Sequence, residues 1–293
     1  MGQQQTQLKD TFFIYDDSHI VGYVESLMNV RIFQPPNNLL IHNEYGIKPT
    51  WIKYIMLPNK NKLSYFVIDP KSDPSDKNKS KSKNKDRKYI LWSHGNSGDL
   101  MSLYPILKSF YDGMNGNIGF IAYDYEGYGY SDGICSERNC YNDLTCMVKY
   151  ALQTIQIKKK NLFLIGQSLG TGIVVDFCFR HLWETPIVLI SPYKSISRVM
   201  IDPHWTNFIA NGIINYLDMF TTHHKLDILS CPIIIYHGIN DALIYPSHSI
   251  EMYNDHKDKI DLILIENANH SDILHYIKPT ELLNIILKDD NNM

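Results

Sequence analysis

The sequence lacks three features that would assign it to large classes of protein. It has no uninterrupted apolar run of about 18 residues or more, so it predicts no membrane-spanning helix. It has no basic excess, because 28 Lys and Arg stand against 31 Asp and Glu, and this balance argues against a nucleic-acid partner. Its five cysteines are an odd number without a Cys-x-x-Cys spacing, so we expect reduced thiols rather than disulfides.

Signals for a cofactor, a metal or secretion are also missing. Neither a phosphate-binding P-loop nor a dinucleotide-binding glycine pattern occurs. The adjacent His223 and His224 have no third ligand at a metal-binding spacing, so we expect neither a metal nor a cofactor. The N-terminus has no basic segment followed by an apolar stretch, and secretion is therefore not expected.

Alternating apolar and helical patterns predict one α/β domain. With 44% hydrophobic and 20% charged residues, the chain has enough apolar material for a large core. Near-continuous apolar runs are typical of parallel strands buried on both faces, and the helices between them predict right-handed crossovers. The expected strands cover residues 89–93, 118–123, 162–165, 187–190, 233–236 and 262–265. The expected helices cover residues 100–111, 138–156, 170–182, 247–254 and 279–287.

Two earlier strand-like runs complete the predicted architecture. Residues 51–57 and 63–68 are rich in Ile, Tyr and Val, and Pro58 begins the turn between them, so we expect an antiparallel hairpin. The sequence therefore predicts a mostly parallel central sheet with helices on both faces and an N-terminal antiparallel hairpin. This domain is assigned to residues 41–293, and residues 1–40 form an N-terminal extension.

Two segments interrupt the pattern of strands and helices. Residues 71–88 hold eight Lys or Arg and three Asp, a net charge of about +5, which predicts a disordered basic surface insertion. The alternative is a polybasic patch for an anionic membrane leaflet. The irregular residues 191–226 fall between two expected strands and are a candidate lid or cap.

A serine between glycines is the strongest chemical signal in the sequence. Ser168 is the centre of Gly166-Gln167-Ser168-Leu169-Gly170, which follows an expected strand and precedes an expected helix. Such a reversal forces a strained backbone that only small neighbours permit, and it holds the hydroxyl at the carboxyl edge of the sheet. We therefore expect Ser168 to be a nucleophile.

Candidates for the base and the orienting acid follow Ser168 in the order that this arrangement requires. Asp241 lies just beyond the expected strand 233–236, and His270 lies just beyond the strand 262–265. Both residues should therefore lie at the same sheet edge as Ser168. Asp241 would orient the imidazole of His270, which would remove the proton of Ser168.

The donors of an oxyanion hole can also be predicted. One is the backbone N–H of Leu169, the residue after the nucleophile, and we assign the other to Asn96 in the glycine-bracketed loop after strand 89–93. His94 in the same loop is expected to be structural. The Asp124–Ser131 loop after the next strand is expected to shape the pocket without a chemical step.

The first six residues fit a pattern for N-myristoylation. Met1-Gly2-Gln3-Gln4-Gln5-Thr6 matches M-G-x-x-x-[ST], which would place the acyl group on Gly2, although short patterns also arise by chance. A single myristoyl chain binds membranes only marginally, so the basic residues 71–88 would have to supply a second signal. The predicted location is the cytoplasmic side, peripheral at the plasma membrane.

Several of these motifs together resemble one family. The sequence is similar to the α/β-hydrolases, within them to the Bem46-like branch, and most of all to the abhydrolase-domain-containing 17 depalmitoylases. The residues that carry this resemblance are His94-Gly95-Asn96, Tyr123 to Gly129, Ser136-Glu137-Arg138-Asn139 with Tyr141, Gly166 to Thr171, Ser191-Pro192, His237-Gly238 with Asp241, and Ala268 to Asp272.

The resemblance implies an activity and its substrates. It implies the α/β-hydrolase fold and a serine hydrolase that cleaves long-chain acyl esters or thioesters, with a palmitoyl-protein thioesterase as one form. The partner would be an acylated protein or a lipid, and a membrane surface is a candidate partner. A lysophospholipase or monoacylglycerol lipase and a non-catalytic membrane-associated scaffold are the alternatives. Those depalmitoylases are similar in having a cysteine-rich N-terminus, whereas this sequence has no cysteine before Cys135.

Overall fold

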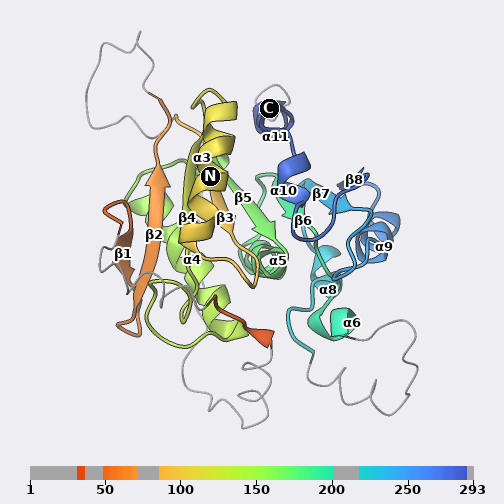
Figure 1. The fold of residues 1–293 in the computed structure, drawn as a ribbon, viewed down its shortest axis with the longest axis horizontal. Helices are drawn as coiled ribbons and strands as arrows, with labels where there is room; N and C mark the ends of the chain where they lie inside the picture. Colours follow the sequence, from red (N-terminus) through yellow and green to blue (C-terminus); the bar gives the residue numbers. More distant parts are fainter. Residues whose placement is uncertain (1–31, 37–48, 72–85, 201–217, 289–293) are drawn as a thin grey trace, which may run out of the picture.

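The computed structural model describes residues 32–36, 49–71, 86–200 and 218–288 (Figure 1). Three sequence predictions therefore lie wholly or partly outside the described residues. These are the acylation of Gly2, the disorder of most of the basic insertion, and the middle of the candidate lid, residues 201–217. No described helix has both the length and the apolar character needed to cross a membrane.

A single twisted sheet of eight strands organises the described residues. In space the strands follow the order β1-β2-β4-β3-β5-β6-β7-β8. All neighbours from β4 to β8 are parallel, as expected for apolar runs joined by helical crossovers. The strands are β1 (Lys53–Met56), β2 (Lys62–Ile68), β3 (Tyr89–Ser93), β4 (Gly119–Tyr123), β5 (Leu162–Gln167), β6 (Ile187–Ile190), β7 (Ile233–Gly238) and β8 (Ile260–Ile265).

The predicted hairpin forms one end of this sheet. β1 and β2 pair antiparallel, with Met56 opposite Lys62 across the turn. β2 then pairs antiparallel with β4, and Tyr65 lies opposite Tyr123. The predicted architecture, a mostly parallel sheet with an antiparallel hairpin, is therefore confirmed.

Helices cover both faces of the sheet because successive strand residues point to opposite sides (Figure 1). In β3, Leu91 belongs to the core beneath α4 and α5, whereas Ile90 and Trp92 belong to the core beneath α3, α10 and α11. The helices are α3 (Leu100–Gly113), α4 (Glu137–Gln153), α5 (Leu169–His181), α6 (Ile196–Met200), α8 (His223–Leu226), α9 (Ser247–Asp255), α10 (Ile273–Tyr276) and α11 (Pro279–Lys288).

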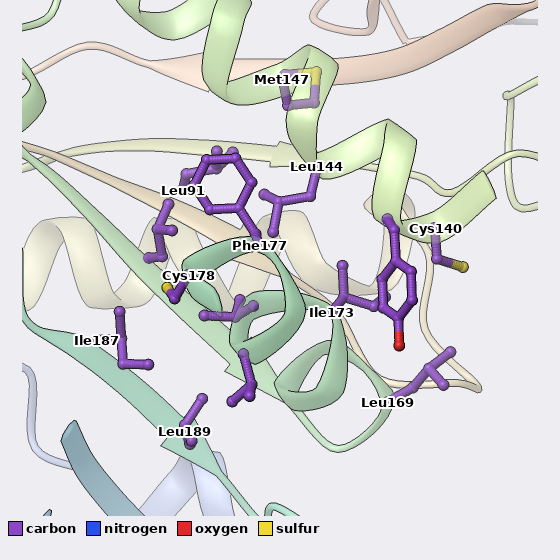
Figure 2. Close-up of a cluster of buried hydrophobic side chains, with 14 of the residues drawn as sticks. Leu91, Cys140, Leu144, Met147, Leu169, Ile173, Phe177, Cys178, Ile187 and Leu189 are labelled. Carbon is purple, nitrogen blue, oxygen red and sulfur yellow. The ribbon is translucent and has the colours of Figure 1, made fainter. Parts of the chain in front are cut away.

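The helix that follows Ser168 is enclosed in the larger of these two cores. Figure 2 shows Phe177 of α5 beside Leu144 of α4, while Ile187 and Leu189 of β6 lie on the other side of α5. Every residue of α5 from Leu169 to Cys178 is buried. Complete burial fixes the direction of α5, and therefore the position of its first turn next to Ser168.

The structure also describes the end of the N-terminal extension. Ile32 and Phe33 are 8% and 6% exposed and belong to the same core as α4 and α5. Residues 32–36, which the sequence places in the N-terminal extension, thus pack against the α/β domain. All five cysteines are free, and four of them are buried.

Candidate active site

Ser168 occupies a strained turn between β5 and α5. Its backbone has φ +49° and ψ −116°, in the positive-φ region that side chains other than glycine rarely adopt. Two backbone hydrogen bonds hold it there: Ser168 N–H donates to the Ile190 carbonyl (2.8 Å), and Thr171 N–H donates to the Ser168 carbonyl (2.9 Å). The turn therefore presents the hydroxyl at the carboxyl edge of the sheet, as the sequence motif predicts.

Gly166 and Gly170 make this turn sterically possible. A Cβ atom on Gly166 would lie 2.4 Å from the Gly170 carbonyl oxygen, and one on Gly170 would lie 2.1 Å from the Ser93 carbonyl oxygen. Both contacts are with backbone atoms, which cannot move aside as a flexible side chain can. The two glycines are therefore required by the close approach of β3, β5 and α5 around Ser168.

His270 reaches Ser168 from the loop after β8. Its Nε2 lies 3.0 Å from Ser168 Oγ. The loop is held by Asp272, whose carboxylate accepts hydrogen bonds from Asn269 N–H (2.7 Å) and from Asn269 Nδ2 (2.6 Å). Hydrogen bonds within the loop thus hold its conformation, and the loop places the imidazole against the hydroxyl of Ser168.

Asp241 sets the protonation pattern of that imidazole. His270 Nδ1 lies 2.7 Å from Asp241 Oδ2, and since a carboxylate only accepts, Nδ1 must carry the proton. Nε2 then has a free electron pair that faces the hydroxyl of Ser168. The second oxygen of Asp241 accepts from the N–H groups of Leu243 (3.0 Å) and Ile244 (2.8 Å).

Asp241 remains ionised although it is buried. Burial alone would raise the pKa of this carboxyl group, but hydrogen bonds from His237 and His270 outweigh that effect and hold the pKa well below its usual range. The three residues that the sequence selects, Ser168, Asp241 and His270, are therefore brought together in one hydrogen-bonded chain.

His237 is a neighbour of this chain that sequence reasoning did not single out. It is fully buried, and its Nε2 lies 3.4 Å from Asp241 Oδ2 and 2.8 Å from the Ile244 carbonyl oxygen. The carbonyl requires a proton on Nε2, so Nδ1 accepts from Ser249 Oγ (2.6 Å). The signals available for it were its position in β7, four residues before Asp241, and its place in the His237-Gly238 motif of the family resemblance.

The loop between β3 and α3 lies directly against Ser168. A Cβ atom on Gly95 would be 3.4 Å from the Ser168 Cβ, which shows how near the loop approaches. Its carbonyl groups are engaged: Tyr125 OH donates to the His94 carbonyl (2.6 Å), and Gly98 N–H donates to the Gly95 carbonyl (3.0 Å).

The two expected oxyanion donors lie on separate elements near the nucleophile. Asn96 belongs to this loop, and Leu169 is the first residue of α5. Within the described part of the chain, neither backbone N–H donates a hydrogen bond. Neither amide is therefore occupied by another acceptor among the described residues, as the predicted oxyanion role requires.

His94 lies beneath the loop and not beside the hydroxyl. Its Nδ1 donates to the Gly95 carbonyl (2.8 Å), and its Nε2 lies 3.7 Å from Asp124 Oδ1. Burial lowers the pKa of His94 to about 4 and raises that of Asp124 to about 7. Asp124 also accepts hydrogen bonds from Ser64 Oγ (2.8 Å) and Leu100 N–H (2.8 Å), so it joins the loop to β2 and α3.

The described ends of the candidate lid are tied to each other and to α5. Ile196 N–H donates to the Met219 carbonyl (3.0 Å), and Thr222 N–H donates to the Lys194 carbonyl (2.8 Å). Tyr193 OH donates to the Leu169 carbonyl (3.2 Å). The segment therefore leaves and returns beside the first turn of α5, next to Ser168.

The described residues contain no group of three or more His, Cys, Asp or Glu side chains that could hold a metal ion. His223, considered at the sequence level, instead directs its Nδ1 to the Lys194 carbonyl (2.9 Å). The groups gathered around Ser168 are a hydroxyl, an imidazole, a carboxylate and free amides. This set is suited to nucleophilic acyl transfer.

Comparisons with known proteins point to one family. The family model Hydrolase_4, described as serine aminopeptidase S33, matches residues 87–217. The protein L404 of Acanthamoeba polyphaga mimivirus, whose name assigns it to the α/β hydrolases, is 37% identical over 230 residues, which is 78% of this chain and 80% of L404. The α/β hydrolase domain-containing protein 17C of Mus musculus is 31% identical over 196 residues, which is 66% of this chain and 58% of the mouse protein. The chain thus spans little more than half the length of that relative.

Solved structures show the same fold at low sequence identity. Est1E from Butyrivibrio proteoclasticus matches with a TM-score of 0.60 at 16% identity, over 81% of this chain and 100% of Est1E. The Pyrococcus furiosus esterase Pf2001 matches with a TM-score of 0.59 at 17% identity, over 85% of this chain and 95% of the esterase.

Proposed function

Because the chain belongs to the α/β-hydrolase family, we propose that it is a serine hydrolase that cleaves long-chain acyl esters or thioesters. One observation carries the proposal: the hydrogen-bonded chain from Ser168 Oγ through His270 to Asp241 at a strained strand-to-helix turn. A hydroxyl, a correctly protonated imidazole and a buried carboxylate in this order are what a serine hydrolase needs.

The reaction follows from these contacts. His270 Nε2 takes the proton as Ser168 Oγ attacks the acyl carbon, and the N–H groups of Leu169 and Asn96 donate to the oxyanion. The intermediate collapses, the imidazolium gives its proton to the leaving oxygen or sulfur, and the acyl group stays on Ser168. Water then attacks the acyl-enzyme with His270 as base, which releases the fatty acid and restores the hydroxyl.

Two observations support a long acyl chain as the substrate group. Ile239, Leu243 and Tyr245 are exposed apolar residues on the loop that carries Asp241. Neighbouring exposed apolar side chains of this kind suit a lipid or an acylated surface. The likeness to the α/β hydrolase domain-containing protein 17C agrees with the resemblance found in the sequence, which implies thioesters on protein cysteines.

Membrane attachment remains a separate proposal from the sequence. Acylation of Gly2, aided by the basic residues 71–88, would place the enzyme peripherally on the cytoplasmic side of the plasma membrane, near acylated proteins and lipids.

The choice between thioester and lipid substrates can be tested directly. We expect the purified chain to release palmitate from an S-palmitoyl-cysteine peptide with a kcat/KM at least about tenfold above that for palmitoyl-lysophosphatidylcholine or monopalmitoylglycerol. Mass spectrometry of free palmitate measures all three, with Ser168→Ala as the matched control. Faster turnover of either lipid would contradict the thioesterase assignment. Turnover of short p-nitrophenyl esters alone would contradict the long-chain substrate.

A further inference from the structure

The side chain of Asn96 holds a distant segment of the chain. We call residues 32–36 the strap, and Figure 1 shows it in red toward the end of the molecule where the parallel strands have their carboxyl ends. Asn96 Nδ2 donates to the Ile32 carbonyl (2.6 Å), and Gln34 N–H donates to Asn96 Oδ1 (3.2 Å). One amide side chain thus makes a two-point contact with the strap backbone.

A third hydrogen bond fixes the orientation of this amide. Tyr128 OH donates to Asn96 Oδ1 (2.6 Å), so the oxygen accepts two hydrogen bonds while the nitrogen donates to a carbonyl. The Asn96 side chain is therefore held by the strap and Tyr128 through three hydrogen bonds. The group of Asn96 that remains for an oxyanion is its backbone N–H.

The strap is buried on its other side by aromatic contacts. The ring of Phe33 lies edge-on to that of Phe220, with centroids 6.1 Å apart. Phe220 N–H donates to Glu137 Oε1 (2.6 Å), which also accepts from Tyr141 OH (2.6 Å), and burial raises the pKa of Glu137. The strap is thus seated between the loop that carries Asn96 and the returning end of the candidate lid.

We propose that Asn96 is a positioning residue whose side-chain amide docks the strap onto the oxyanion loop, and that the docked strap holds the Asn96 N–H in place for the developing oxyanion. This inference rests on the proposed function and adds a required element to its active site. A displacement of about 1 Å in a catalytic group can reduce turnover substantially, so a loop tied down at its side chain has a direct catalytic advantage.

The decisive variant removes one hydrogen bond from the strap side. Gln34→Pro deletes the N–H that donates to Asn96 Oδ1, whereas Gln34→Ala keeps it and removes only an exposed side chain. We expect kcat of Gln34→Pro to be about fivefold below that of Gln34→Ala, the effect of one hydrogen bond of about 1 kcal/mol. KM should agree within about twofold, because the oxyanion contact is made in the transition state.

Asn96→Ala tests the same contact from the loop side. We expect its kcat to fall about 10- to 100-fold at unchanged KM. The double variant Asn96→Ala/Gln34→Pro should be no slower than Asn96→Ala, because both changes break one contact and their effects are then not additive. Thermal unfolding of each variant establishes that it is folded at the assay temperature.

Amide hydrogen exchange in the strap measures whether the strap is docked, and it does not depend on catalytic activity. Since Pro35 and Pro36 have no amide hydrogen, the exchange of residues 33–36 is that of the Phe33 and Gln34 amides alone, and NMR follows the Gln34 amide individually. We expect faster exchange there in Asn96→Ala than in the wild type.

Three results would overturn the inference. These are equal kcat for the two Gln34 variants, additive losses in the double variant, or unchanged exchange in Asn96→Ala. Failure of the wild type itself to hydrolyse any ester would instead count against the proposed function, and the exchange measurement would still decide whether Asn96 docks the strap.

Discussion

Ser168→Ala is expected to lower kcat for a p-nitrophenyl ester by about five to six orders of magnitude, down to the residual rate that binding and the oxyanion donors sustain. The loss follows from the geometry, because Ser168 Oγ is the nucleophilic atom that lies 3.0 Å from His270 Nε2. Alanine leaves the imidazole with no proton to remove. Initial rates at saturating ester measure this effect.

The fold should tolerate this change. The strained turn is held by backbone hydrogen bonds of Ser168 and by the two close glycines, none of which involves the hydroxyl. We therefore expect the thermal unfolding midpoint of Ser168→Ala to equal that of the wild type. Ser230→Ala, on an exposed residue, is the matched substitution and should keep full activity. Turnover of Ser168→Ala near the wild-type rate would contradict the assignment of the nucleophile.

Asp241→Asn is expected to lower kcat by about 10⁴-fold while KM changes little. The N–H groups of Leu243 and Ile244 require an acceptor, so the asparagine oxygen would turn toward them. Its NH₂ group would then donate to His270 Nδ1 and force the imidazole proton onto Nε2. That nitrogen would present a proton to Ser168 instead of an electron pair.

The same substitution at an exposed position separates this effect from a loss of charge. Asp258→Asn removes one carboxylate from the surface and should leave kcat unchanged. Steady-state kinetics of both variants, with circular dichroism to establish folding, make the comparison. An Asp241→Asn enzyme within about tenfold of the wild type would show that the carboxylate does not set the protonation of His270.

The architecture could be predicted because the strands are buried on both faces. β3, β5, β6 and β7 are almost continuous apolar runs, and their predicted limits agree with the observed ones within two residues. The longer helices were predicted because helical patterns alternate with these strands, and the structure shows how two of them begin. Asp99 caps α3 and accepts from Ser102 N–H, and Ser136 caps α4 and accepts from Asn139 N–H.

The short helices could not be predicted in this way. α6, α8 and α10 contain four or five residues each, which is too short for a helical repeat of apolar positions to show. Tertiary contacts hold them instead: in α8, Lys225 pairs with the buried Asp176 of α5 (2.9 Å), and Leu226 is fully buried. Such contacts join residues about 50 positions apart in the chain. A local sequence pattern therefore cannot predict these short helices.

The same distinction between local patterns and tertiary contacts applies to the residues of the site. Ser168, Asp241 and His270 could be selected because each directly follows a recognisable strand, and parallel strands end at one edge. The contact between Asn96 and the strap joins residues more than 60 positions apart through a single amide. His237 is part of a strand and is satisfied by a backbone carbonyl and a serine. The motifs around Asn96 and His237 are visible in the sequence, but the side-chain partners of these two residues are not, and only the assembled fold shows what each one touches.

The reactivity of Ser168 is the central claim, and a fluorophosphonate probe tests it most directly, because the probe reacts covalently with a serine that an adjacent base activates. After incubation of the purified protein, peptide mass spectrometry identifies the modified residue. We predict one adduct per chain on Ser168, formed rapidly in the wild type, slowed strongly in Asp241→Asn and absent in Ser168→Ala. A folded wild-type protein that stays unlabelled, or an adduct on another residue, would contradict the account.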